Sequence, residues 1–249
     1  MSESLFTSKY HIDLRDVDFK KELKWSALFS YFQEIASLAA SDLGLGIDTL
    51  QKGNGLAWVL TKIRVDVDRL PSWGEEIIIE TWPLEPGKLN FDRDYIVRDQ
   101  DGKSIIRAIS SWVIIDLKER KLKRSKSIPF SFPTPKVDRA MKDTFSKLKH
   151  NEQVETVYTK TIGYSDVDFN GHLNNSKYID YIMDCFDIND HKKYDVMSIE
   201  VNFIHEALPG ESILLKKDVT LHDNQVYVEG INEKNNRIVF KAKLKVVKP

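Results

Sequence analysis

Hydrophobic residues follow a helical spacing in two parts of the chain. The first stripe recurs every three or four positions and consists of Trp25, Leu28, Phe29, Phe32, Ala36 and Ala39. The second consists of Tyr178, Ile179, Ile182, Cys185 and Phe186, and Asn174, Asn175 or Ser176 is placed to cap its start. Each pattern predicts an amphipathic helix with one face turned toward a core.

Runs rich in Ile, Val and aromatic residues follow each predicted helix and are separated by turn residues such as Pro86-Gly87 and Asn235-Asn236. In the first half the predicted strands are 58–68, 76–82, 91–98 and 105–116. In the second half they are 197–205, 212–221, 226–231 and 238–247. Each half is therefore expected to form one helix followed by an antiparallel meander.

A short repeat links the two halves. Asp16–Phe19 has the same four residues as Asp166–Phe169, and Leu23 recurs as Leu173 without a gap. The fold class we predict is α+β, with two tandem hotdog domains, each a long helix wrapped by a curved antiparallel sheet. The expected domains are residues 1–128 and 152–249, joined by a proline-containing linker over 129–151 that includes a polar, potentially helical stretch.

The charge and composition of the chain argue against several classes of function. The 249 residues carry 37 Lys and Arg against 38 Asp and Glu, so the net charge offers no general attraction for nucleic acid. No run of about 18 apolar residues predicts a membrane span, and because no basic n-region followed by an apolar h-region opens the sequence, we expect no signal peptide. With a single cysteine, Cys185, a cytoplasmic location is expected. The sequence has no glycine-rich phosphate loop and no paired Cys and His ligands, so we expect neither a cofactor nor a metal.

Candidate chemistry is concentrated just before the second helix, where Asp168, Asn170 and His172 occupy alternate positions. The segment begins like a calcium-binding loop, but the twelfth position is Lys177, where a bidentate carboxylate would be needed. Asp and Asn are also ordinary turn and capping residues. However, the first copy of the repeat keeps Asp18 and replaces the other two side chains by Lys20 and Glu22. Residues present in only one copy suggest a task carried out once.

This segment, with Asn174, Asn175 and Tyr178 beyond it, resembles the active-site segment of plant and bacterial acyl-acyl-carrier-protein (acyl-ACP) thioesterases. Further similar segments are 58–62, 71–74, 80–82, 87–88, 93–95, 107–113 and 122–124. The resemblance implies that Asp168, Asn170, His172 and Glu206 are catalytic. It also implies that no thiol acts after that glutamate, since the plant enzymes have a cysteine where this chain has Ala207.

The same resemblance implies hydrolysis of the fatty acyl-ACP thioester, which releases a free fatty acid and holo-ACP in fatty acid biosynthesis. The first half would supply the acyl-chain pocket and the second half the chemistry. The implied partner is an acyl carrier protein, with no nucleic acid or membrane partner, and homodimer formation is left open. Other hotdog activities also stay open, namely acyl-CoA hydrolysis, enoyl hydration and acyl binding without catalysis.

A run of six Lys and Arg within 118–126 is either a docking patch for an acidic carrier protein or a solvated hairpin.

Overall fold

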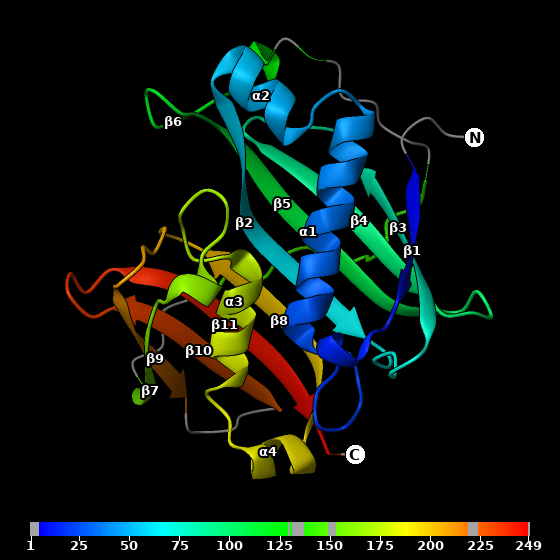
Figure 1. The fold of residues 1–249 in the computed structure, drawn as a ribbon, viewed down its shortest axis with the longest axis vertical. Coiled ribbons are helices and arrows are strands. Elements are labelled where there is room, and N and C mark those ends of the chain that lie inside the picture. The colour runs from blue at the N-terminus through cyan, green and yellow to red at the C-terminus, as the bar shows by residue number, and fades with distance from the viewer. Residues whose placement is uncertain (1–4, 129, 131–136, 149–152, 219–223, 249) are drawn as a thin grey trace. The chain divides into compact units, whose positions relative to one another are not determined.

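The structure is a computed structural model that describes residues 5–128, 130, 137–148, 153–218 and 224–248. The chain forms two compact units (Figure 1). Unit 1 comprises residues 1–63 and 68–144, and unit 2 comprises residues 64–67 and 145–249.

Unit 1 is a helix lying against an antiparallel sheet. Its strands lie in the order β1-β3-β4-β5-β2, with the short β6 beside β5. Its elements are β1 (Phe6–His11), η1 (Leu14–Asp16), α1 (Trp25–Asp42), α2 (Ile47–Asn54), β2 (Leu56–Val67), β3 (Glu76–Pro83), β4 (Asn90–Arg98), β5 (Ser104–Asp116), β6 (Lys121–Leu122) and η2 (Ser125–Ser127). Figure 1 shows α1 crossing one face of this sheet.

The apolar stripe of α1 forms the core of unit 1. All six residues of the predicted stripe are buried, and Ile35 is buried with them. The ring of Phe32 lies 4.8 Å from that of Tyr95 on β4, which identifies the sheet face that α1 covers. The helix is thus held by burial of its apolar face rather than by end caps, since no side chain caps its N-terminus.

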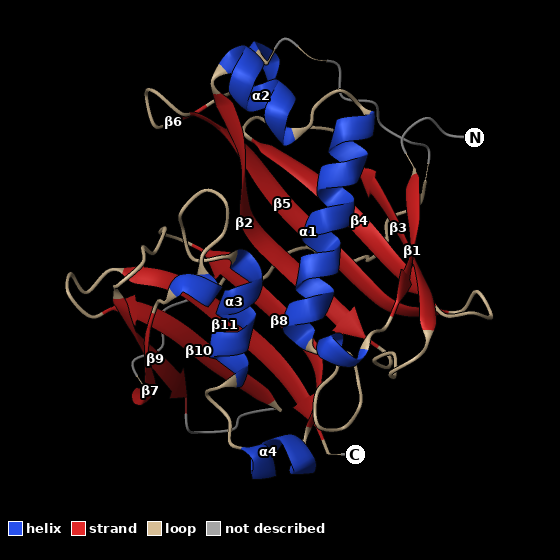
Figure 2. Cartoon of the chain, viewed as in Figure 1, coloured by secondary structure: helices blue, strands red, loops and turns tan. Residues whose placement is uncertain are grey.

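Unit 2 repeats this architecture with a shorter helix. Its strands lie in the order β8-β11-β10-β9-β7. Its elements are β7 (Val154–Thr161), η3 (Tyr164–Asp166), α3 (Asn175–Met183), α4 (Ile188–Lys193), β8 (Asp195–Phe203), β9 (Ser212–Asp218), β10 (Gln225–Asn232) and β11 (Ile238–Val247). The helix and strand segments of both units are distinguished by colour in Figure 2. The predicted helix against an antiparallel sheet in each half is confirmed.

Several details of the sequence prediction are corrected. The strand after each long helix does not open a simple meander, because β2 lies beside β5 and β8 beside β11. In each unit, the strand that precedes the long helix pairs with the second strand after that helix. These pairs are β1 with β3 and β7 with β9. The stripe of α3 was also extended too far, since α3 ends at Met183 and Cys185 and Phe186 lie beyond it. The predicted strand end at Leu221 lies outside the described residues.

The described part of the predicted linker is anchored by buried carboxylates. Asp94 on β4, which is fully buried, accepts hydrogen bonds from the Arg139 guanidinium at 2.8 and 3.2 Å and from the backbone N–H of Ala140 at 2.8 Å. In unit 2, the buried Glu200 accepts bonds from the backbone N–H and hydroxyl of Ser146. Residues 137–148 contain no helix, so the polar stretch is fixed by these contacts instead. The predicted linker residues 129, 131–136 and 149–151 lie outside the described residues.

Candidate active site

The loop before α3 is organised around the carboxylate of Asp168. Its Oδ1 accepts hydrogen bonds from the backbone N–H groups of Asn170 at 2.9 Å and His172 at 3.3 Å. Its Oδ2 lies 3.5 Å from the amide Nδ2 of Asn170. The backbone N–H of Asp168 in turn donates to the carbonyl of His172 at 2.9 Å. The three predicted residues on this loop are therefore held in one tight turn.

The first copy of the repeat builds the same turn in unit 1. Oδ1 of Asp18 accepts from the backbone N–H groups of Lys20 at 2.8 Å and Glu22 at 3.2 Å, and the N–H of Asp18 donates to the carbonyl of Glu22 at 2.9 Å. The turn needs a left-handed residue, which is Gly171 with φ 79° in unit 2 and Lys21 with φ 63° in unit 1. The shared aspartate thus has a structural task that is independent of the differing side chains.

Glu206 is brought to this loop by backbone pairing. It lies between β8 and β9, next to Ala207, whose carbonyl accepts the N–H of Leu173 at 2.9 Å. Leu173 follows His172 and Ala207 follows Glu206, so this bond places the side chains of His172 and Glu206 close together. Nε2 of His172 lies 3.5 Å from Oε2 of Glu206, and both side chains are partly exposed, at 29% and 40%. The structure therefore brings Glu206 to the loop that carries Asp168, Asn170 and His172, the other three residues that the resemblance selected.

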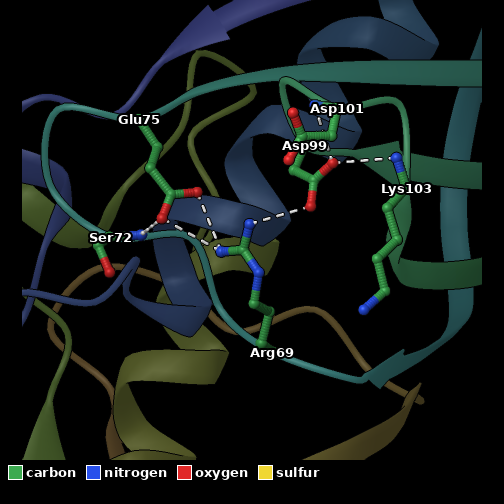
Figure 3. A network of polar contacts seen from close by, with 6 residues as sticks. All are labelled: Arg69, Ser72, Glu75, Asp99, Asp101 and Lys103. Atoms are coloured by element: carbon green, nitrogen blue, oxygen red, sulfur yellow. Dashed lines mark hydrogen bonds and ion pairs between the residues drawn. The ribbon is translucent and has the colours of Figure 1, made fainter.

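Unit 1 has a different residue at the position of Glu206. The bond from Leu23 N–H to the carbonyl of Pro71, at 2.8 Å, corresponds to the bond from Leu173 to Ala207. Leu70 precedes Pro71, so no carboxylate stands at this position. Beside it, Arg69 is paired with Glu75 at 3.0 Å and with Asp99 at 3.2 Å (Figure 3). The equivalent loop of unit 1 is braced by ion pairs and lacks the glutamate and the histidine.

The charged side chains around Asp99 form ion pairs and hydrogen bonds that stabilise the fold of unit 1. Burial opposes ionisation of Asp99, but hydrogen bonds from the backbone N–H of Lys103 and from Arg69 outweigh it and lower the pKa of this carboxyl below its ordinary value (Figure 3). The side chain of Glu75 also accepts the backbone N–H of Ser72 at 3.2 Å. These contacts fix the turn between β2 and β3.

Tyr178 is a site residue to which the sequence assigned no role. It lies on the buried face of α3, and its ring packs edge-on against Phe203 and Phe240, with centroids 5.4 and 5.5 Å away. Burial raises the pKa of its hydroxyl above the ordinary value, and the charges of Glu206 and Asp168 raise it further. Tyr178 therefore presents a neutral phenol near both carboxylates. Its helical spacing indicated only a core residue.

Cys185 lies in an apolar setting. It is buried, its thiol donates to the carbonyl of Tyr181 at 3.3 Å, and burial raises the pKa of the thiol to about 12. A thiol with that pKa is protonated near neutral pH and is a poor nucleophile. This agrees with the sequence prediction that it belongs to the core.

His205, the immediate neighbour of Glu206, lies apart from this chemistry. It is exposed, and its Nδ1 contacts the carbonyl of Ile238 at 2.7 Å. His205 lies at a bend beyond the end of β8, where its backbone N–H donates to the carbonyl of Val239 at 3.1 Å and its ring is engaged away from the His172 contact. It therefore offers a natural control for His172.

The described residues contain neither a cluster of metal-ligating side chains nor a membrane-spanning helix. No group of three or more His, Cys, Asp or Glu in them could hold a metal ion. Among the helices that the structure describes, none combines the length and apolar character that a membrane span requires.

Comparison with known proteins agrees with the fold. Residues 3–127 match the acyl-ACP thioesterase N-terminal domain and residues 149–247 match the C-terminal domain. A crystal structure of an acyl-ACP thioesterase from Bacteroides thetaiotaomicron is 28% identical and superposes with a TM-score of 0.88 over 99% of this chain and 100% of that one.

Two plant relatives are similar over most of this chain. A chloroplastic acyl-ACP hydrolase of Cuphea viscosissima is 28% identical over 72% of this chain and 46% of its own length. A chloroplastic palmitoyl-acyl carrier protein thioesterase of Gossypium hirsutum is 25% identical over 88% of this chain and 56% of its own length. The chain thus spans about half the length of these curated relatives. Because both family domains match in order and together cover most of the sequence, this double-hotdog chain belongs to the acyl-ACP thioesterase family.

Proposed function

We propose that this protein hydrolyses the thioester of a fatty acyl-acyl-carrier protein, releasing a free fatty acid and holo-ACP in fatty acid biosynthesis. The observation that carries the proposal is the contact between His172 and Glu206 beside the loop of Asp168 and Asn170. Membership of the acyl-ACP thioesterase family supports the substrate class.

In the proposed reaction His172 acts as the base. Its imidazole takes a proton from water as the water oxygen attacks the thioester carbonyl carbon, and Glu206, 3.5 Å away, stabilises the imidazolium that forms. The carbon–sulfur bond then breaks, and the proton passes to the departing thiolate. The products are a carboxylic acid and a thiol, and the reaction needs no oxidant or other reactant beyond water.

Asn170 and Asp168 have supporting roles in this scheme. The carbonyl oxygen gains negative charge during attack and requires a hydrogen-bond donor aimed at it. The amide of Asn170 is exposed and can donate, whereas the backbone N–H of Ser176 at the start of α3 is already taken by the side chain of Asn174 at 3.0 Å. Asp168 holds the loop and orients that amide through its Oδ2. This favours a positioning role for Asp168 over direct attack to form an anhydride.

The test is thiol release from acyl-ACP, followed with a thiol reagent under single-turnover conditions. We expect His172→Ala and Glu206→Gln each to lower the rate by about 100-fold or more while the proteins stay folded. His205→Ala is the matched control, because this histidine neighbours Glu206 but binds the carbonyl of Ile238, and it should keep near-parental activity. Unchanged rates for both His172→Ala and Glu206→Gln would refute the assignment.

The same assay separates the competing functions. Hydration of an enoyl thioester without thiol release would indicate a hydratase, and binding of acyl-ACP without either reaction would indicate an acyl-binding protein. An equal kcat/KM for acyl-CoA and acyl-ACP would indicate a thioesterase without a carrier-protein preference. Release of thiol with a clear preference for acyl-ACP is the result that the proposal requires.

A further inference from the structure

Tyr178 lies in the first turn of α3, on the helix face that is turned toward the sheet of unit 2 (Figure 1). Its backbone N–H donates to the carbonyl of the capping residue Asn174 at 3.4 Å, and the residue is only 3% exposed. Long side chains of a helix point back toward its N-terminus. The phenol of Tyr178 therefore reaches toward the loop that carries Asp168 and His172.

The ring of Tyr178 packs where β8 leads into the segment of Glu206. It lies edge-on to Phe203, the last residue of β8, with the ring centroids 5.4 Å apart. It is also edge-on to Phe240, which is paired with Phe203 across the sheet, at 5.5 Å. Glu206 follows Phe203 by three residues. These aromatic contacts thus fix the ring at the start of the segment that carries the glutamate.

The hydroxyl of Tyr178 is close to the carboxylates of the site. Burial raises its pKa, and among the charges that raise it further that of Glu206 has the largest effect. The backbone N–H of Ala207 acts in the opposite direction. The phenol therefore stays protonated and keeps an O–H donor, and a carboxylate is the strongest acceptor that it can meet there.

Unit 1 has leucine in place of both Tyr178 and Glu206. In the repeat, Tyr178 corresponds to Leu28, which is also buried and makes the same helical hydrogen bond, at 3.0 Å. Leu70 stands where unit 2 has Glu206. Since a leucine fills this helix position in unit 1, packing alone does not require a hydroxyl. Both polar groups are present in the unit that has the histidine, and both are absent from the other unit.

We infer that Tyr178 is a positioning residue, whose hydroxyl holds the carboxylate of Glu206 against His172. The side chain of Glu206 is 40% exposed, so it can turn into solvent unless one oxygen is held. A hydrogen bond from the phenol to one oxygen leaves the other, Oε2, at 3.5 Å from Nε2 of His172. The inference rests on the proposed function, because it concerns how Glu206 is held while His172 acts as the base.

The experiment compares Tyr178→Phe with Tyr181→Phe in single-turnover thiol release from acyl-ACP. Tyr178→Phe keeps the ring and should lower the maximal rate by about 10-fold or more, with the half-saturating concentration within about twofold of the parent. Tyr181 is the matched control, because it is a buried tyrosine of the same helix. Its counterpart Tyr31 in unit 1 donates to Asp16 at 2.9 Å, so this tyrosine is common to both units. Tyr181→Phe should keep the rate within about threefold.

A double-mutant cycle with Glu206→Gln gives a readout that a packing role would not reproduce. If Tyr178 acts through the carboxylate of Glu206, Tyr178→Phe should lower the rate by less than about threefold once that charge is gone. A residue that served only the packing of α3 would lower the rate by the same factor in both backgrounds.

A crystal structure of Tyr178→Phe supplies evidence that does not depend on turnover. The contact of 3.5 Å between Nε2 of His172 and Oε2 of Glu206 should lengthen beyond the ion-pair limit of about 4 Å. The same contact should be unchanged in Tyr181→Phe.

A parental rate in Tyr178→Phe would overturn the inference, and so would an unchanged contact between His172 and Glu206 in its crystal structure. An equal loss of rate in Tyr181→Phe, an equal factor in the Glu206→Gln background, or failure of Tyr178→Phe to fold would also overturn it, because each assigns the hydroxyl to packing. The proposed function fails by a different result. If the wild type releases no thiol, or if Glu206→Gln keeps the parental rate, the reaction scheme is wrong, and the crystal structure of Tyr178→Phe still decides whether the hydroxyl holds Glu206.

Discussion

Replacement of the two equivalent aspartates can separate structural from catalytic roles within one chain. Asp18 and Asp168 each hold a turn through one carboxylate oxygen that accepts two backbone N–H groups, at 2.8 and 3.2 Å in unit 1 and at 2.9 and 3.3 Å in unit 2. Substitution by Ala removes both bonds. At these partly buried positions we expect Asp18→Ala and Asp168→Ala each to lower the free energy of unfolding by about 1–2 kcal/mol.

Such a loss corresponds to a fall in melting temperature of roughly 2–6 °C for units of this size, which differential scanning calorimetry can measure. The two Ala variants should differ in catalytic activity. Asp18→Ala should leave kcat within about threefold of the parent, a change in activation free energy below roughly 1 kcal/mol. Asp168→Ala should lower kcat by about 100-fold or more, because the amide of Asn170 loses its partner.

Substitution by Asn refines the test, since an amide keeps one acceptor oxygen for the turn but loses the negative charge. Asp168→Asn should therefore melt close to the parent and still lose activity, whereas Asp18→Asn should be close to the parent in both respects. The reasoning is refuted if Asp18→Ala lowers kcat as strongly as Asp168→Ala, or if neither Ala variant changes the melting temperature.

Three further predictions follow from the contacts. Lys20→Ala and Glu22→Ala should keep kcat within about threefold, and active-site titration should give one acyl site per chain, because unit 1 lacks the histidine and the glutamate; a hundredfold fall in a folded variant would show that both units share the chemistry. Cys185→Ala should retain most activity, since the pKa of its thiol is raised to about 12 by burial and the thiol stays protonated below that pH; inactivation with intact folding would identify a different nucleophile. Charge reversal at the exposed Lys121 and Arg124 should raise KM for acyl-ACP and weaken its salt dependence, while a small thioester is unaffected, and equal effects on both substrates would argue against docking there.

The sequence was sufficient for the elements whose signal is local. The stripe from Trp25 to Ala39 predicted α1, and the eight strand runs correspond to β2–β5 and β8–β11. The repeated Asp-Val-Asp-Phe segment predicted two equivalent turns, and the structure shows the same hydrogen bonds in both. The loop residues Asp168, Asn170 and His172 could be selected because they are close together in the chain.

Pairing between distant segments was decided only by the tertiary structure. The places of β1 and β7 depend on contacts across many residues, and their short runs carry no pattern that selects a partner strand. Glu206 was linked to His172 by resemblance, but their 3.5 Å contact exists because the carbonyl of Ala207 accepts the N–H of Leu173. Likewise, Arg93 and Asp94 are adjacent charges in the sequence, and only the sheet turns Asp94 toward Arg139 and Arg93 toward the hydroxyl of Thr81. Local spacing determines which face a residue takes, whereas the partner that it meets there depends on how distant segments pack.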